Sequence, residues 1–293
     1  MIEQAPAILW LAPILALPGA LLLALARHPA RCGERLALAA GLTVSLWPCL
    51  LLWSTVLGRR WTPCGLRTAM LLGLAILLLD HFRSSHRPGA GSKCSAADQP
   101  RSGGGAVLSI VLLAACCARA VQARSLVVPA WVDGLHHSAV TQAILDAGAL
   151  PASLRPYIPV DQFAYHFGFH AQSAATAWTT GHSAADAVLW TGQALSAIAV
   201  LGAYLLAIRA GCRPLAATMA AAVPATLFTY PAYFVSWSRY TQLAGLVALP
   251  AAWTFLADAT RPRSGTREVV LAAVAGGGLA LVHYRVAIFY VVG

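Results

Sequence analysis

Charged residues are scarce in this chain. Asp, Glu, Lys and Arg make up 10% of its 293 residues and only 10 residues are acidic, whereas hydrophobic residues make up 59%. A soluble domain carries about 25% charged residues, so this chain has too few polar side chains to cover a surface in water. The scarcity argues against an ordinary soluble protein and indicates lipid as the solvent for most of the chain.

Cysteine patterns that hold metals or build disulfide frameworks are also missing. The seven cysteines form no CxxC pair and no Cys/His spacing typical of zinc. The N-terminal segment MIEQAPAILW has no basic residue ahead of its apolar run, which argues against a cleaved signal peptide and predicts a retained first span.

Nucleic acid is not an expected partner, although the formal net charge is +10. The arginines fall in short clusters between apolar runs and do not line one face or form a tail. Such clusters are typical of the cytoplasmic loops of membrane proteins.

Eight apolar runs have the length and composition of membrane spans. A ninth begins near Val286 and reaches Gly293, so we expect a chain truncated within a helix. The sequence therefore predicts an all-α, polytopic transmembrane helix bundle in a bacterial inner or plasma membrane, with amphipathic interfacial helices in one long external loop. The expected spans are Ala7–Ala26, Leu36–Leu57, Leu66–Leu79, Ala106–Gln122, Ala187–Arg209, Leu215–Tyr230, Gln242–Ala257 and Val269–Val282.

The arginine clusters also predict topology. Alternation places the N-terminus, the segment around Asp133 and the turn at Trp237–Arg239 outside, with four Arg-rich loops in the cytoplasm. One loop opposes this assignment, because Arg59, Arg60 and Arg67 fall on the external side. The chain then divides into N-terminal spans (1–122, with a flexible linker at 81–104), an external loop (123–186) and truncated C-terminal spans (187–293).

The external loop concentrates ionisable residues. It holds five of the nine histidines and four of the ten acidic residues. Asp133 is expected to cap an amphipathic helix that ends at Gly148 and lies along the membrane surface. A second helix is expected from about Tyr165 to Trp178, with His166 and His170 four residues apart on one face.

Five segments of this region resemble the polytopic GT-C glycosyltransferases. They are WVDGLHH, ILDAGALP, YHFGFHA, WSRYTQLAGL and LVHYR, in this order between about Pro129 and Arg285. In that superfamily a catalytic Asp in an early external loop precedes a horizontal helix, and it maps onto Asp133. The chain departs from the pattern in two ways. An acidic residue or a nearby Tyr or His usually follows the Asp, whereas here Gly134 follows it and His136 and His137 come next, and the loop follows the fourth span instead of the first.

The resemblance implies transfer of a sugar from a polyprenyl-phosphate donor to an acceptor at the external face. Asp133 would be the general base, and Arg239 and Arg285 would hold the donor phosphate. The lipid-linked donor and membrane lipid would be the partners, and no resident metal or other cofactor is assigned. The residues implied to bind substrate are His136, His137, His166, His170, Arg239 and Arg285, with Trp131, Tyr165 and Trp178 against the sugar or lipid.

Other interpretations of the same residues stay open. Asp133 serves equally as a plain helix cap, the histidines as a packed pair, and the arginines as interface anchors. A transporter and a non-catalytic membrane scaffold are the alternative functions. A third alternative is an enzyme with a divalent metal on His136, His166, His170 and Asp161.

Overall fold

The computed structural model describes residues 5–30, 32–85, 103–226 and 229–293, which contain helices and no strand. Six stretches in this part of the chain are long and apolar enough to cross a membrane. The protein is therefore an all-α polytopic helix bundle, as the sequence predicts. In chain order the helices are α1 (Ala5–Leu25), α2 (Cys32–Val56), α3 (Pro63–Ser85), α4 (Gly103–Ala123), α5 (Trp131–Ala147), α6 (Gly168–Thr180), α7 (Ala184–Ile198), α8 (Val200–Arg209), α9 (Pro214–Thr226), α10 (Thr229–Ser236), α11 (Tyr240–Ala259), α12 (Thr266–Val282) and α13 (Tyr284–Val292).

Each expected span corresponds to a helix or to two consecutive helices. The six long apolar stretches are α2, α3, α4, α7 with α8, α9 with α10, and α11, whereas the apolar part of α1 and the whole of α12 are shorter. α3 continues to Ser85, so the prediction of a linker from residue 81 is wrong at its start. It is wrong at its end too, because α4 begins at Gly103. The part between them, 86–102, lies outside the described residues.

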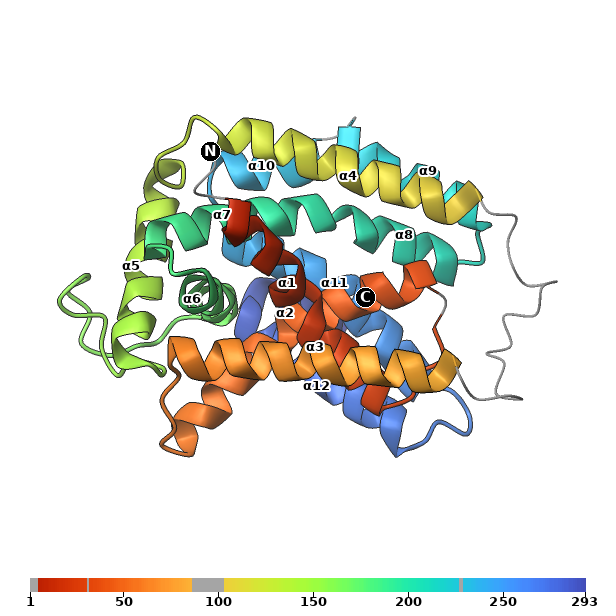
Figure 1. The fold of residues 1–293 in the computed structure, drawn as a ribbon, viewed down its shortest axis with the longest axis horizontal. Coiled ribbons are helices and arrows are strands. Elements are labelled where there is room, and N and C mark those ends of the chain that lie inside the picture. Colours follow the sequence, from red (N-terminus) through yellow and green to blue (C-terminus); the bar gives the residue numbers. More distant parts are fainter. Residues whose placement is uncertain (1–4, 31, 86–102, 227–228) are drawn as a thin grey trace.

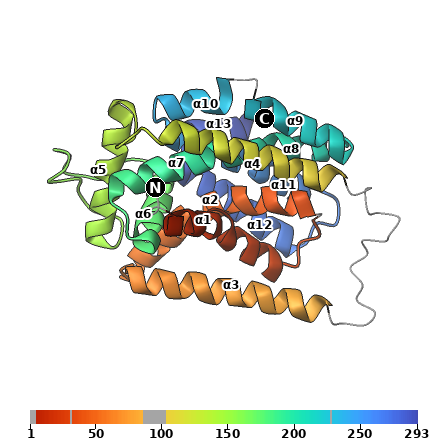
Figure 2. The same ribbon diagram turned by 45° about the horizontal axis from the view of Figure 1, so that its top comes forward.

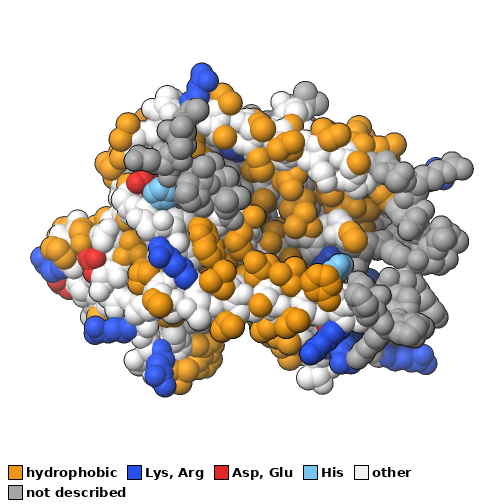
Figure 3. Space-filling view, viewed as in Figure 1, with side chains coloured by type: hydrophobic (Ala, Val, Ile, Leu, Met, Phe, Trp, Pro, Cys, Tyr) orange, Lys and Arg blue, Asp and Glu red, His pale blue; other side chains and the backbone are white. Residues whose placement is uncertain are grey.

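The long helices run side by side, and two short helices lie at one end of them. Figure 1 shows α3, α4 and the α7–α8 pair running lengthwise, with α5 crossing their left-hand ends and α6 seen end-on beside it. α3 lies at the edge of the bundle in Figure 2, where it packs on α1 and α6. Hydrophobic side chains cover the middle of the face in Figure 3, and Lys and Arg gather mainly towards its two ends.

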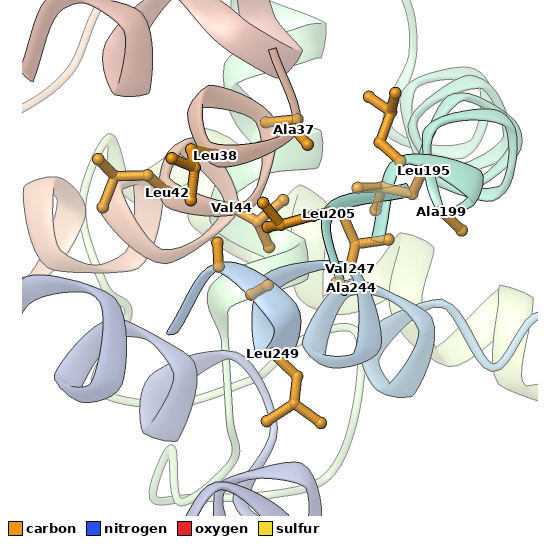
Figure 4. Close-up of a cluster of buried hydrophobic side chains, with 14 of the residues drawn as sticks. Ala37, Leu38, Leu42, Val44, Leu195, Ala199, Leu205, Ala244, Val247 and Leu249 are labelled. Carbon is orange, nitrogen blue, oxygen red and sulfur yellow. The ribbon is translucent and has the colours of Figure 1, made fainter. Parts of the chain in front are cut away.

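The core lies around α2, which packs against α1, α11, α12 and α8. Figure 4 shows leucines, valines and alanines of α2, the α7–α8 pair and α11 meeting there. Small residues let the helices approach closely, as is typical of membrane bundles. A Cβ on Gly278 of α12 would lie 2.1 Å from the carbonyl oxygen of Ser45 on α2, so only glycine permits that contact.

α5 buries one face and leaves the other exposed. Its buried residues recur at helical spacing, from Gly134 through His137 and Val140 to Ile144. Gly148 ends the helix in the left-handed conformation, with φ of 63°, as the sequence predicts. The prediction that Asp133 caps α5 is wrong, because the N-cap is Ala130 and Asp133 lies in the first turn.

α6 is shorter than predicted and more deeply buried. It begins at Gly168 and every residue from there to Thr179 is buried, between α1, α2, α3, α5, α7, α11 and α12. His166 precedes the helix, so the prediction that it shares a helix face with His170 is wrong. Gly181 ends α6 in the left-handed conformation, with φ of 80°.

Candidate functional site

Five histidines from separate parts of the chain meet at the end of the bundle where α5 crosses. They are contributed by α5, the segment before α6, α6 itself and the junction of α12 and α13, and we call this region the histidine end. Its histidines are His136, His137, His166, His170 and His283.

The innermost contact is between α5 and α6. The Nδ1 atom of His137 lies 3.0 Å from the Nε2 atom of His170, and both side chains are buried. One imidazole donates and the other accepts, so the two tautomers are coupled. Tyr240 at the start of α11 packs beside His137, with 6.4 Å between ring centroids.

A second pair lies closer to the surface. The ring centroids of His166 and His283 are 4.6 Å apart, and Tyr165 stacks on His166 at 3.9 Å. The Nε2 atom of His166 and the Nδ1 atom of His283 are buried and have no hydrogen-bond partner within the described ranges. Unpaired buried polar atoms cost free energy, so these two atoms are available to a bound molecule.

Tyr165 links the histidines to two opposite charges. Its ring lies 5.6 Å from that of His136 and 5.8 Å from that of His170. Burial raises the pKa of the Tyr165 hydroxyl, the nearby Asp133 carboxylate raises it further, and Arg285 lowers it. Asp133, the predicted base, and Arg285, a predicted phosphate ligand, therefore both influence the same phenol electrostatically. Both side chains are exposed, and the guanidinium of Arg285 contacts Tyr284.

Burial keeps His137, His166 and His170 neutral at pH 7. Burial lowers the pKa of His137 to about 3 and that of His166 to about 4, with neighbouring imidazoles adding to the effect. Burial also holds the pKa of His170 well below its usual range. Neutral imidazoles donate and accept hydrogen bonds, as sugar hydroxyls require, but do not supply charge to a phosphate.

Arg239 lies apart from the histidines. Its guanidinium packs over the rings of Tyr233 and Trp237, at 5.6 and 5.4 Å. Trp237 in turn packs against Trp131 at 4.7 Å. The structure therefore places Arg239 in an aromatic cluster at the start of α5, where its contacts are those of an interface anchor.

Trp178 is also remote from the histidines. It is buried at the far end of α6 and packs on Trp61. The other loop acids have local partners: Asp161 pairs with Arg155, and Asp146 accepts from Tyr157. Among the residues that the structure describes, no group of three His, Cys, Asp or Glu side chains has the geometry to hold a metal ion.

Sequence reasoning missed His283 and Tyr240 as members of the site. His283 stands two residues before Arg285, at the end of an expected span and inside the segment LVHYR. That position was the available signal. Tyr240 begins α11 directly after Arg239, and nothing in its local sequence indicates a contact with His137.

An apolar groove lies next to the histidine end, between α1, α2, α4 and α7. Its volume is about 450 Å³, and Arg119 and Gln193 are the charged and amide side chains among its lining residues. Gln193 is buried and neither amide atom has a partner in the described part of the chain. The preceding residue, Gly192, does not line the groove but abuts the ring of Tyr240, so α7 connects the groove with a residue that contacts His137.

The opposite end of the bundle has a different chemistry. Arg209 binds Asp258 through two hydrogen bonds of 3.1 and 3.0 Å and forms an ion pair with Glu34 at 2.8 Å. Arg261 also pairs with Asp258, and His28 lies 3.7 Å from it. We call these five residues the charged end, and they line a cavity of about 550 Å³.

The fold and its polar site define the chain as a multi-pass, all-α membrane protein with a buried histidine cluster at one end of the bundle. The chain belongs to a family of unknown function, DUF6541, whose sequence profile matches residues 12–293. No curated protein and no solved structure matches the chain.

Proposed function

We propose that the protein is a membrane glycosyltransferase that moves a sugar from a polyprenyl-phosphate donor to an acceptor hydroxyl at the outer face of the cell membrane. The observation that carries the proposal is the position of Tyr165: its ring lies near those of His136 and His170, and Asp133 and Arg285 both influence its hydroxyl electrostatically. A carboxylate, a guanidinium and neutral hydrogen-bonding side chains are the groups that this reaction needs.

In the proposed reaction the acceptor oxygen attacks the anomeric carbon of the sugar. The bond between that carbon and the phosphate oxygen breaks, and the configuration inverts. Asp133 takes the proton of the acceptor hydroxyl as general base. Arg285 stabilises the negative charge that develops on the departing phosphate.

The histidines would orient the sugar. Because burial keeps His137 and His166 neutral at pH 7, they would bind hydroxyl groups and leave the phosphate to Arg285. The unpaired Nε2 atom of His166 and Nδ1 atom of His283 would each gain a partner when a sugar binds.

The groove beside Gln193 would hold the isoprenoid chain of the donor. Its walls are apolar over α1, α4 and α7, and Arg119 lies among its lining residues. Its contact with Tyr240 through α7 would place a chain in the groove next to a headgroup among the histidines.

The test compares two carboxylates of the same segment. We expect Asp133→Asn to lower transfer from a panel of polyprenyl-phosphate hexoses by about 10²- to 10⁴-fold, the range for loss of a general base. Asp161→Asn is the matched control, because Asp161 is exposed and pairs only with Arg155, and it should keep wild-type activity. Full activity in Asp133→Asn, or equal losses in both variants, would contradict the assignment.

Polar groups inside the bundle favour a transporter as a second candidate. Gln172 and Ser173 of α6 and Gln193 and Ser196 of α7 are buried, and their side chains lack partners among the described residues. Unsatisfied polar groups at such depth often mark a polar path. The test is to place the protein in liposomes of fixed lipid composition and to measure both solute flux and sugar transfer. Flux without sugar transfer would support this candidate over the first.

A further inference from the structure

A second apolar groove lies on the other side of α1, between α1, α2 and α3. Its volume is about 560 Å³, within the range of ligand sites. Most of its lining is aliphatic, including Leu21, Leu46 and Met70. α3 forms its outer wall and has only about a tenth of its span buried, because its main contacts are with α1 and α6.

One mouth of this groove is polar and lies at the histidine end. Arg60, Trp61 and Thr62 line the mouth, in the turn between α2 and α3. The backbone N–H of Trp61 donates to the carbonyl of Gly148, which ends α5, at 2.6 Å. The mouth therefore stays fixed beside α5 and opens at the same end as the histidines.

The arginines of this turn are the ones that oppose the predicted topology. The stretch 57–67 contains three arginines and no acidic residue. Arg67 already donates to the carbonyl of Thr179 at 2.9 Å, and Arg59 is exposed and does not line the groove. Arg60 lines the groove and has no side-chain hydrogen bond or ion pair in the described part of the chain.

We propose that this groove binds an anionic phospholipid, with its phosphate on Arg60 and an acyl chain along α1 and α2. An unpaired guanidinium at the mouth of an otherwise apolar groove matches a molecule with one anionic and one apolar end. The open side along α3 faces the lipid side of the bundle, so a lipid can enter without an opening of the helices. The site would also explain why this loop is basic on the external side. It does not depend on sugar transfer.

The test measures phospholipid binding to the full chain in neutral detergent by native mass spectrometry. We expect wild-type protein to retain phosphatidylglycerol in preference to phosphatidylcholine. Arg60→Gln should weaken phosphatidylglycerol binding about tenfold, the effect of losing one charge-assisted hydrogen bond. Arg59→Gln is the matched control, with the same charge change one residue away, and should bind as the wild type does.

A second variant tests the apolar part of the site. Ala69 lines the groove and is exposed, so Ala69→Phe would fill the groove without entering the core. It should weaken phosphatidylglycerol binding while Arg60 remains in place. Glycerol 3-phosphate should not compete with phosphatidylglycerol, because it has no chain.

Three results would overturn the proposal. Equal losses of phosphatidylglycerol binding in Arg59→Gln and Arg60→Gln would show that binding depends on the general surface charge and not on Arg60. Unchanged binding in Ala69→Phe would show that no chain occupies the groove. Effective competition by glycerol 3-phosphate would show a site for free anions. None of these results bears on Asp133, so failure here is distinguishable from failure of the proposed transferase.

Discussion

The two ends of the bundle hold their polar side chains in opposite ways. At the charged end, Arg209 satisfies Asp258 and Glu34, and three chain segments are joined by complementary charges. At the histidine end, burial keeps His137, His166 and His170 neutral, and His166 and His283 each leave a buried nitrogen without a partner among the described residues. The first arrangement stabilises the fold, whereas the second carries a free-energy cost that a ligand would relieve.

Within the charged end, His28 differs from the arginines because it is uncharged. It lies 3.7 Å from Asp258, but burial outweighs that carboxylate and lowers the pKa of His28. His28 is therefore neutral at pH 7, and the stabilising pairs of the charged end are those of arginine.

The largest expected effect tests whether the charged end is structural. Arg209→Gln leaves Glu34 and Asp258, both buried, without their main cation and should lower the free energy of unfolding by about 3–5 kcal/mol. Arg213→Gln, an exposed neighbour, is the control and should change it by less than about 0.5 kcal/mol. Denaturant or thermal unfolding in detergent measures both. Equal stability of the two variants would contradict a structural role for the ion pairs.

The next largest effect is the pH dependence of the free energy of unfolding, which depends on the histidine end. His137 has a pKa of about 3 in the folded protein against 6.5 for an unperturbed histidine, so between these values the unfolded chain binds one proton more. The free energy of unfolding therefore falls as the pH falls below 6.5, by about 1.4 kcal/mol per pH unit for one buried imidazole.

The variant His137→Gln should reduce this slope, since its amide does not titrate and can still hydrogen-bond His170. His81→Gln, at an exposed position on α3, is the control and should leave the slope unchanged. The measurement is unfolding at several pH values from 7 to 4. A slope that is the same in all three proteins would show that His137 is not held neutral by burial.

The sequence predicts the bundle well because lipid imposes a simple rule on each span. A helix in lipid satisfies its own backbone, so a long apolar run is sufficient to identify it. Helix ends are set by other contacts. α5 begins before Asp133 because Trp131 packs on Trp237 and Ser238 donates to the carbonyl of Ala130, neither of which local sequence indicates.

The site is only partly predictable because it too depends on contacts between residues far apart in the sequence. The backbone N–H of Phe167 donates to the carbonyl of Leu281 at 3.1 Å, and α6 begins only after it. This contact places His166 beside His283, far away in the sequence, and separates it from the helix of His170. The sequence identified four of the five histidines that gather and missed His283, and tertiary contacts decide which of them pair.

The most direct test of the account asks which end of the bundle receives the donor. A polyprenyl-phosphate sugar with a photoreactive group on the sugar would be cross-linked to the protein in membranes, and the modified peptides would be mapped by mass spectrometry. The account predicts labelling of the peptides that carry Asp133, Tyr165 and Arg285, lost on competition with unlabelled donor. Competed labelling at the charged end around Arg209 and Arg261, with none at the histidine end, would contradict it.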